Sequence, residues 1–363
     1  MKVRVAKKQL ADSLSHIERI IPHRSSNPGL SLVRLELSSD RLGFSGSNMD
    51  IDIEATLPAD VEGAGQFALP AQVFAQVVRA LPGDSVELAS GERELEVSSG
   101  SYATKLQLAD TANAPVLDFP EAYAGAASAQ DLTASLSHVR YAAAVAEYQA
   151  IFRGVKLEFS DARTRAIATD GFRLAYYDVK GATGLEGDIV VPARSVDELV
   201  RILGDGQEVG LELAGHQLSI KSGPYRLNLK LMEGSFPDYQ RVIPQNFPVN
   251  ITLDAKALAE AVARVAVMAD KTANNRVDLF IKDGNLEITA EGGFGRAQES
   301  LEVHQEGSDA EIALAYNAKY LVDAINPVEG DVQLRFSGAT SPSVLVSLED
   351  ASYLAMVVPL RVG

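Results

Sequence analysis

The segment most suggestive of chemistry is 168–175, which reads Ala-Thr-Asp-Gly-Phe-Arg-Leu-Ala. A carboxylate three residues before a guanidinium could supply a general base, Asp170, and an anion clamp, Arg173. The same residues are typical of a turn between strands, because Asp-Gly favours a tight turn and an arginine beside it would be a surface residue. The turn is the simpler interpretation, and the sequence leaves both open.

Other catalytic signatures are missing from the sequence. It has neither a Gly-x-x-x-x-Gly-Lys-Ser/Thr phosphate loop nor a Gly-x-Gly-x-x-Gly fingerprint, and 292–295 (Gly-Gly-Phe-Gly) is more typical of a link between strands. The 5 histidines are scattered without metal-ligand spacing. With 0 cysteines, the chain has no disulfide, thiolate metal site or cysteine nucleophile. We therefore expect no metal, no cofactor and no catalytic centre.

The elements that must position these residues occur in three copies. Apolar residues at helical spacing recur after a shift of 122 and again after a shift of 126 or 125. The first set is Leu10, Leu14, Ile17; Leu132, Leu136, Val139; and Leu258, Val262, Val265. The second set is Phe74, Val77, Val78, Leu81; Val196, Leu199, Val200, Leu203; and Leu321, Ala324, Ile325, Val328. His16 and His138 are equivalent positions, which indicates repeat structure more than a site. We predict three similar domains at 1–122, 123–248 and 249–363.

Composition and charge narrow the class of protein. Apolar content of 46% and charged content of 23% are typical of an ordinary globular protein, and no apolar run is long enough to span a membrane. The net charge of −16 alone argues against a protein that coats itself in nucleic acid or binds an anionic membrane. However, the six predicted helices sum to +1, so the remainder carries −17. A surface shared by these helices would be much less acidic than the rest.

Within each repeat, alternating apolar residues predict antiparallel strands around two helices. The predicted helices are 7–20, 71–81, 131–147, 193–203, 254–271 and 317–326. Pro70 and Pro192 introduce the second helix of the first two repeats, and Asn317 stands there as a cap in the third. Most connections are too short for parallel crossovers. We predict an α+β fold in which each domain is an antiparallel sheet with two helices on one face.

The segment 168–175 resembles the Ala-Thr-Asp-Gly-His-Arg-Leu-Ala signature of the bacterial sliding clamp family, the beta subunit of DNA polymerase III. The resemblance covers the whole chain and includes the threefold repeat, the run 236–244 (Phe-Pro-Asp-Tyr-Gln-Arg-Val-Ile-Pro) and the run 356–361 (Met-Val-Val-Pro-Leu-Arg). It implies the DNA clamp fold, a head-to-tail homodimer that closes six domains into a ring, and duplex DNA held without sequence preference or catalysis.

The resemblance also implies DNA-facing residues. Weak, scattered contacts suit sliding, because many phosphate contacts would slow it and give a steep salt dependence. The expected residues are Arg24, in a loop that matches a DNA-contacting loop of the family, and Lys7, Lys8, Arg79, Arg140, Arg194, Arg201, Arg264 and Lys319 on the helices. Taken singly, each is better explained as a solvated surface charge. The aromatic pair that the family has before position 152 is Ala150-Ile151 here, so that contact is not expected.

The family has a pocket between its second and third domains for a peptide of the type Gln-Leu-x-Leu-Phe, and the resemblance implies the same here. Apolar walls would bury the Leu and Phe anchors, while Arg and Thr would orient polar groups. The implied residues are Phe152, Thr169, Gly171, Phe172, Arg173, Leu174, Pro237, Arg241, Val242, Met356, Val358, Pro359, Leu360 and Arg361. Phe172 stands where many members have His, and the tail runs on as Val362-Gly363.

The dimer would join the first repeat of one copy to the third repeat of the other, because an exposed strand edge needs covering. The expected residues are Lys105, Leu106 and Leu108 on an edge strand, with Val267, Met268, Glu299 and Glu302 opposite. Val267 and Met268 could equally be ordinary core.

The implied partners are duplex DNA, a second copy, the polymerase III alpha subunit, the clamp loader, and other polymerases and repair proteins that carry the peptide. A membrane is not among them, and the cytoplasm is the expected location. A repeat-domain scaffold that binds peptides but not DNA is the alternative function, and an enzyme that depends on Asp170 is a more distant one.

Overall fold

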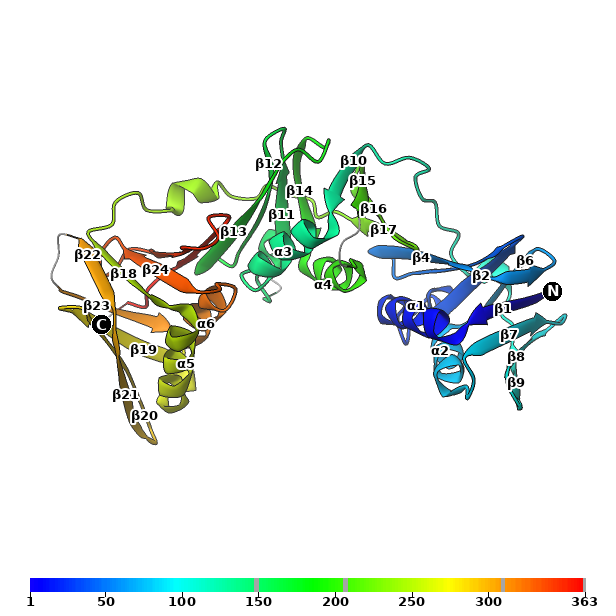
Figure 1. Cartoon of the computed structure of the whole chain (residues 1–363), viewed down its shortest axis with the longest axis horizontal. Coiled ribbons are helices and arrows are strands. Elements are labelled where there is room, and N and C mark those ends of the chain that lie inside the picture. Colours follow the sequence, from blue (N-terminus) through cyan, green and yellow to red (C-terminus); the bar gives the residue numbers. More distant parts are fainter. Residues whose placement is uncertain (147–149, 205–207, 308–310, 362–363) are drawn as a thin grey trace. The chain divides into compact units, whose positions relative to one another are not determined.

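The computed structural model describes residues 1–146, 150–204, 208–307 and 311–361, and Figure 1 shows its helices and strands. Two compact units divide the chain. The first consists of Met1–Thr133, Thr183–Leu185 and Arg194–Leu231, and the second consists of Ala134–Ala182, Glu186–Ala193 and Met232–Gly363. The middle repeat is therefore shared between the two units, and each unit is described by itself.

A pattern of one strand, one helix and three strands runs through the described residues, twice in each repeat. The first repeat has β1 (Lys2–Ala6), α1 (Lys7–Ile20), β2 (Leu32–Ser38), β3 (Arg41–Ser47) and β4 (Ile51–Pro58), then β6 (Gly65–Pro70), α2 (Ala71–Ala80), β7 (Ser85–Ser90), β8 (Glu94–Ser99) and β9 (Tyr102–Gln107). The second has β10 (Gly125–Ser128), α3 (Ala129–Arg140), β11 (Gly154–Phe159), β12 (Arg163–Thr169) and β13 (Arg173–Lys180), then β14 (Gly187–Pro192), α4 (Ala193–Ile202), β15 (Glu208–Ala214), β16 (Gln217–Ser222) and β17 (Tyr225–Lys230). The third has β18 (Val249–Asp254), α5 (Ala255–Val265), β19 (Arg276–Lys282), β20 (Asn285–Gly292) and β21 (Gly295–Glu302), then β23 (Glu311–Asn317), α6 (Ala318–Ile325), β24 (Asp331–Phe336), β25 (Ser343–Ser347) and β26 (Tyr353–Val357). Two short strands, β5 (Asp60–Glu62) and β22 (His304–Gly307), are additional.

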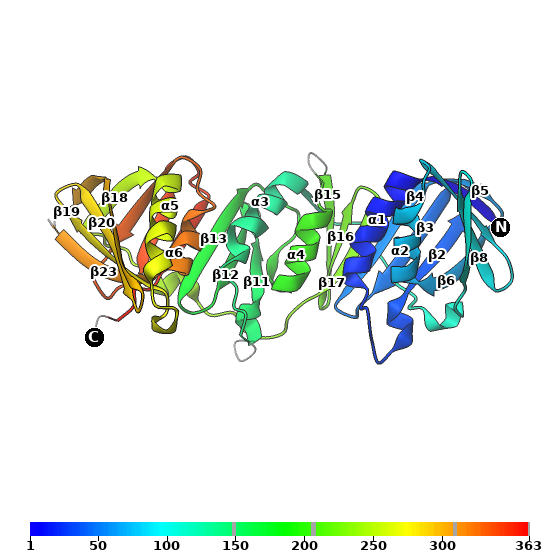
Figure 2. The ribbon, with the colours of Figure 1, turned by 90° about the horizontal axis from the view of Figure 1, so that it is seen from below.

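The first unit contains two antiparallel sheets, with strand orders β5-β1-β7-β8-β9 and β10-β15-β16-β17-β4-β3-β2-β6. Helices α1 and α2 pack on each other, and α1 contacts β1, β3 and β4 (Figure 2). The apolar face predicted for α1 is the buried one, since Leu10, Leu14 and Ile17 are at most 2% exposed. Burial of such residues supplies the main favourable free energy of the core.

The second unit repeats this plan with strand orders β14-β11-β12-β13-β26-β25-β24-β18-β22 and β21-β20-β19-β23. Helices α5 and α6 lie side by side, and their predicted faces are again buried, with Leu258 and Ala324 fully covered. Asn317 caps α6 as predicted, because its side-chain oxygen accepts hydrogen bonds from the backbone N–H groups of Lys319 (3.0 Å) and Tyr320 (3.4 Å).

The α+β class and the antiparallel pairing are confirmed, but the sheets are shared differently from the expectation of one sheet per repeat. Each repeat divides its strands between two sheets. One sheet crosses from the first repeat to the second, where β17 pairs with β4 from Tyr225↔Ala55 to Leu229↔Ile51. Another crosses from the second repeat to the third, where β13 pairs with β26 from Arg173↔Val357 to Tyr177↔Tyr353. Both junctions satisfy strand edges that isolated repeats would expose.

Two of the helices are shorter than predicted. The prediction 131–147 corresponds to α3, which ends at Arg140, and residue 147 lies outside the described residues, as do 362–363 of the predicted third domain. The prediction 254–271 corresponds to α5, which ends at Val265 and continues only as a 3-10 turn, Ala266–Met268. Asp270 then begins a new turn, because its carboxylate accepts a hydrogen bond from the Thr272 backbone N–H at 2.7 Å.

Candidate functional site

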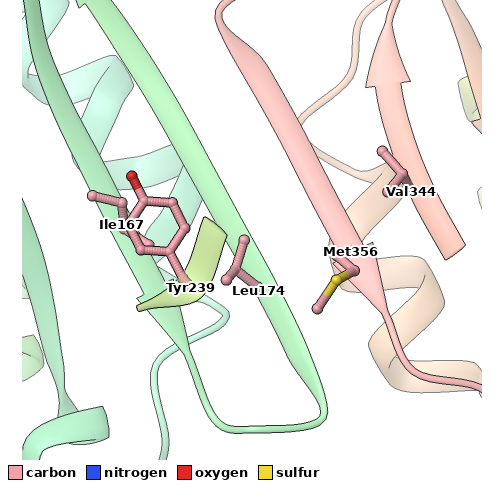
Figure 3. Packing of buried hydrophobic residues seen from close by; sticks show 5 residues of the cluster. All are labelled: Ile167, Leu174, Tyr239, Val344 and Met356. Atoms are coloured by element: carbon pink, nitrogen blue, oxygen red, sulfur yellow. The ribbon is translucent and has the colours of Figure 1, made fainter. Parts of the chain in front are cut away.

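The candidate site is an apolar cluster inside the second unit, at the junction of β13 and β26. Its buried members are Ile167, Leu174, Tyr239, Val344 and Met356, which Figure 3 shows on neighbouring segments. Leu174 and Met356 are direct cross-strand partners, exposed by only 1% and 4%. The half-buried residues that pack around them are Tyr176, Phe236, Ile243, Phe247, Val346 and Leu354. Paired strands therefore bring two residues that are 182 positions apart in the sequence into one apolar cluster.

Tyr239 is held in this cluster by polar contacts at its hydroxyl. The Arg165 guanidinium donates to the hydroxyl at 3.2 Å, and the hydroxyl donates to Glu158 at 2.9 Å. Arg165 also makes two 2.6 Å hydrogen bonds to the Asp178 carboxylate. Burial raises the pKa of Tyr239, so its hydroxyl remains a donor at neutral pH. The aromatic ring thus has a fixed position beside Ile167 and Leu174.

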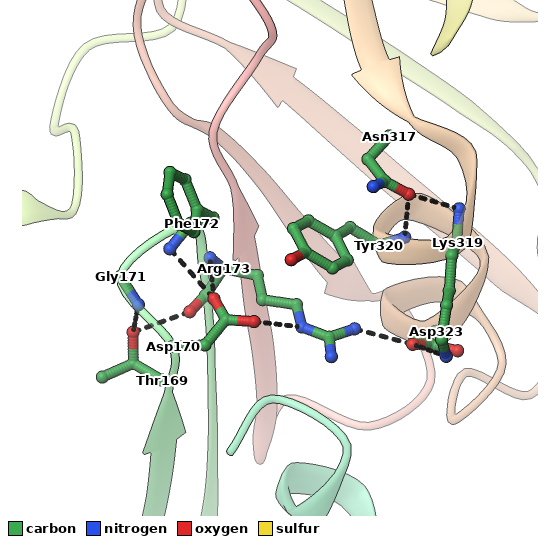
Figure 4. A network of polar contacts seen from close by, with 9 residues as sticks. All are labelled: Thr169, Asp170, Gly171, Phe172, Arg173, Asn317, Lys319, Tyr320 and Asp323. Atoms are coloured by element: carbon green, nitrogen blue, oxygen red, sulfur yellow. Dashed lines mark hydrogen bonds and ion pairs between the residues drawn. The ribbon is translucent and has the colours of Figure 1, made fainter. Parts of the chain in front are cut away.

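The turn between β12 and β13 is closed by hydrogen bonds to its own side chains (Figure 4). The Thr169 hydroxyl accepts from the Gly171 N–H at 3.1 Å and donates to the Arg173 carbonyl at 2.7 Å. The Asp170 carboxylate accepts from the N–H groups of Phe172 and Arg173 at 2.9 and 3.0 Å. Gly171 has φ +89°, which favours glycine, and an added Cβ there would meet nothing within 4 Å. The turn is rigid, and its outer side is open.

Arg173 is buried, so the expectation of a surface arginine in this turn is wrong. Its side chain is 7% exposed and pairs with Asp170 at 3.0 Å and with Asp323 of α6 at 2.6 Å (Figure 4). The guanidinium also lies over the Tyr320 ring, 4.3 Å from its centroid. The physical reason is a partner 150 residues away, which the local sequence does not reveal. The polar groups of Thr169 and Arg173 form hydrogen bonds and ion pairs within this turn and with α6, so they do not point to an open surface. The Asp170 carboxylate is held by the same contacts, so it is not placed as a general base.

The other predicted pocket residues surround the cluster at its rim. Phe172 is 56% exposed and Val242 is 51% exposed, while Pro237 and Arg241 are also exposed. The Phe152 ring meets Phe236 edge to face at 6.2 Å between centroids. The C-terminal run closes the rim, since the Val358 N–H donates to the Phe172 carbonyl (2.9 Å) and the Leu360 N–H to the Ala315 carbonyl (2.7 Å). Pro359 is buried, and Arg361 is exposed.

Sequence reasoning missed several members of the cluster. Tyr239 was available, because it lies in the run 236–244 that carries the family resemblance, but its burial depends on Arg165 and Glu158. Val344 and Val346 alternate on β25, which is a recognisable strand pattern. Ile167 precedes the signature by one residue. Nothing in the local sequence indicates Asp323 as the partner of Arg173.

Most of the proposed DNA-facing side chains lie on helices and have a hydrogen-bond or ion-pair partner in the described chain. The partners are as follows: Lys7 donates to the Leu81 carbonyl, Arg79 pairs with Glu18 (2.5 Å), Arg140 donates to the Ala193 carbonyl (2.9 Å), Arg201 pairs with Glu198 (2.9 Å), Arg264 pairs with Glu260 (3.4 Å) and Glu299 (2.7 Å), and Lys319 pairs with Asp323 (2.8 Å). Lys8, Arg24 and Arg194 are exposed and make no ion pair with any part of the chain that the structure describes.

Four of the residues expected at a dimer contact lie on strands at the edge of a sheet. Lys105 and Leu106 belong to β9, the last strand of its sheet, and Glu299 and Glu302 belong to β21, the last strand of another. Leu108 follows β9, and its N–H donates to the Arg93 carbonyl at 2.9 Å. Val267 is 76% exposed, so its interpretation as ordinary core is wrong, and Met268 beside it is half-buried.

A polar pocket of about 610 Å³ lies elsewhere, in the first unit, between Arg41, Glu54, Lys221 and Arg226. It flanks the β4–β17 junction as the apolar cluster flanks the β13–β26 junction. Arg226 and Glu54 form an ion pair there, with 2.5 Å between the guanidinium nitrogen and the carboxylate oxygen. Among the described residues, no group of three ligating side chains is arranged for a metal ion, and no helix is long and apolar enough to cross a membrane.

Three tandem repeats of paired strand-helix-strand halves, with sheets continuous across the repeat boundaries, define a three-domain DNA clamp. Three family models match successive parts of the chain: the N-terminal domain of the DNA polymerase III beta subunit matches residues 1–118, the central domain 127–238 and the C-terminal domain 240–361. The chain belongs to the DNA polymerase III beta subunit family, the bacterial sliding clamps, which serve as non-catalytic processivity factors.

Individual relatives match this chain over its full length or nearly so. The beta sliding clamp of Caulobacter vibrioides is 29% identical, with 100% of both chains covered, and that of Bacillus subtilis is 27% identical, with 99% of this chain and 100% of the other covered. Among solved structures, the C. crescentus beta sliding clamp has a TM-score of 0.91 at 28% identity, and the B. subtilis polymerase sliding clamp has 0.94 at 25%, each with 100% of both chains covered.

Proposed function

We propose that two copies of this chain close head to tail into a ring around duplex DNA, and that each copy tethers polymerases through the apolar cluster. The observation that carries the ring is a repeated junction. The strands β4, β13 and β21 begin at residues 51, 173 and 295, each 122 after the last, and are equivalent in the three repeats. The strands β9, β17 and β26 are equivalent in the same way, and each begins at a tyrosine: Tyr102, Tyr225 and Tyr353.

Two of the three possible junctions between these strands form within the chain. β4 pairs with β17, and β13 pairs with β26, so of these six strands β9 and β21 are the two that keep an open edge in the described chain. A second copy offers the complementary edge to each. Such a head-to-tail contact is heterologous, and it yields a closed ring when the rotation between copies completes a circle. Lys105 on β9 would meet a strand that carries Glu299 and Glu302, while Leu106, Leu108, Val267 and Met268 supply apolar area.

The domains that would build this ring are 1–122, 123–248 and 249–363, in keeping with the three matched family spans. Their helices would line the hole, with the nine proposed cations from Lys7 to Lys319 facing the DNA. The ring needs no base contacts, because topology retains the DNA and weak phosphate contacts permit sliding. Such a protein acts in the cytoplasm, where the replicating DNA lies.

The apolar cluster supports capture of a short peptide. A Leu and a Phe anchor could bury against half-buried side chains that pack on Leu174 and Met356, such as Val346 and Leu354. Each fully buried anchor contributes roughly 1.5–3 kcal/mol. The open turn at Gly171 and the exposed ring of Phe172 would contact the peptide backbone and its aromatic end. Such peptides would come from the polymerase III alpha subunit, the clamp loader, and other polymerases and repair proteins, in exchange on one pocket.

Mass and retention on DNA test the ring. By light scattering at micromolar concentration we expect twice the 38.7 kDa chain mass. After loading on nicked circular DNA, the protein should stay on the circle through gel filtration and leave once the circle is linearised. A monomer at all concentrations, or equal retention on circular and linear DNA, would overturn the proposal in favour of a peptide-binding scaffold.

A further inference from the structure

Two arginines on the helices of the first unit, Arg79 and Arg201, are paired with nearby carboxylates. Arg79 near the end of α2 and Arg201 near the end of α4 are 122 residues apart and hold equivalent places in two repeats. Arg79 reaches across to Glu18 of α1, with contacts of 2.5 and 3.2 Å. Arg201 instead contacts Glu198 on its own helix at 2.9 Å. The equivalent arginine is thus paired with a glutamate in both repeats, but the glutamate comes from a different position in each.

The third repeat follows the same arrangement in the second unit. Lys319 pairs with Asp323 one turn later on α6, at 2.8 Å, and Arg264 pairs with Glu260 on α5, at 3.4 Å. The acid is the more covered partner in each of these four pairs, by a wide margin in three of them. Glu18, Glu198 and Asp323 are 18%, 14% and 19% exposed, whereas their cations are 45%, 46% and 68% exposed. The cation therefore remains accessible, and the carboxylate lies beneath it.

We propose that Glu18 and Glu198 act as built-in counter-ions, which lower the affinity of the helix surface for phosphate and so set how freely the ring slides. This inference rests on the proposed function. A DNA phosphate that approaches Arg79 or Arg201 must compete with a carboxylate already at contact distance. Each such cation then neutralises less phosphate charge and releases fewer counter-ions from the DNA, so the affinity and its salt dependence both fall.

Stability alone is a weak reason for this arrangement. Exposed ion pairs of this kind contribute little to the free energy of folding, because solvent screens them and two long side chains must be ordered. Arg79 and Arg201 nevertheless hold equivalent positions and both pair with an acid, and a cation of the third repeat, Lys319, pairs with Asp323 at a different position on its helix. A ring that holds DNA by topology does not need tight contacts. Arginines without a paired carboxylate would bind phosphates more strongly and slow the sliding of the ring along the DNA.

The test is the salt dependence of binding to a fluorescent duplex, measured by anisotropy with the full-length dimer. Glu18→Gln with Glu198→Gln keeps the side-chain shapes and removes two negative charges per chain. The slope of log K against log salt should steepen by about 1 for each released arginine. The dimer releases two arginines per chain, so from about 50 to 200 mM salt its affinity should fall roughly a hundredfold more than that of the unmodified protein. The matched control is Glu62→Gln with Glu121→Gln, which changes the net charge equally on exposed residues away from the helices.

A second variant separates this effect from a folding defect. Adding Arg79→Gln and Arg201→Gln to the double variant should return the slope to that of the unmodified protein or below it. An unchanged slope in the double variant, with a normal dimer mass and normal retention on circular DNA, overturns the inference while the proposed function stands. An equal steepening in the control pair also overturns it, because net charge would then be the cause. Loss of retention on circles by the unmodified protein overturns the proposed function itself.

Discussion

Truncation of Met356 is the sharpest test of the apolar cluster as the peptide pocket. The side chain is 4% exposed and lies between Leu174 across the strand pair and Val344 on the neighbouring strand β25. Met356→Ala removes a buried side chain that supports the surface on which one peptide anchor would pack. If half of the roughly 3 kcal/mol upper value for a buried anchor is lost, affinity falls by about 1.5 kcal/mol, or roughly tenfold. The assay is anisotropy titration of a labelled Gln-Leu-x-Leu-Phe peptide, with an anchor-to-alanine peptide as the blank.

The control for Met356→Ala must share its cost in stability. Truncation of a buried Leu or Met costs about 2–5 kcal/mol of folding free energy. Leu279→Ala, in a different sheet of the same unit and 1% exposed at present, should lose comparable stability with peptide affinity intact. Equal affinity loss in both variants would mean that the effect is general destabilisation. Dissociation of the dimer by Met356→Ala, with peptide affinity retained, would refute the placement of the pocket.

Three further outcomes follow from individual contacts. Arg173→Met leaves the carboxylates of Asp170 and Asp323 without their shared cation, so urea unfolding should show a loss of about 3–5 kcal/mol; adding Asp170→Asn should recover part of it, and no loss would contradict a structural role. Leu106→Asp on the β9 edge should give monomers by light scattering, whereas Val116→Asp, at an 82% exposed position, should not; persistent dimers would exclude this edge. Burial, with help from the charge of Arg19, lowers the pKa of His16 below its ordinary value of about 6.5. The native state then binds fewer protons than the unfolded chain near this pH. The unfolding free energy should therefore be highest above about pH 6.5 and should fall as the pH drops below about 6.5. His16→Gln should flatten the dependence, and an identical pH profile would exclude His16 as its source.

Elements encoded by local periodicity were predictable from the sequence. The faces of α1, α5 and α6 follow from apolar spacing alone, and Asn317 caps α6 as its type suggests. Helix ends were less predictable, because α5 stops at Val265 although apolar residues continue to Val267 and Met268. The competing signal is Asp270, whose turn begins within the predicted helix.

Long-range partners were not predictable from local patterns. The pairing of Leu174 with Met356 requires knowing which strand edges meet, and alternation identifies a strand without identifying its neighbour. Arg173 looked like a surface residue because Asp-Gly turns are exposed and Asp323 lies far along the chain. Of the pocket residues implied by resemblance, Leu174 and Met356 belong to the cluster, whereas its other members, Ile167, Tyr239 and Val344, were not implied.

The continuous sheets have a consequence for dividing the protein. The middle repeat contributes β17 to one sheet and β13 to another, and each strand is completed by a neighbour from a different repeat. A middle repeat expressed by itself would expose two bare edges, which are templates for aggregation. Cooperative folding should therefore follow the two compact units, whose shared boundary passes through the middle repeat. The unit that is repeated in the sequence is therefore different from the unit that we expect to fold cooperatively.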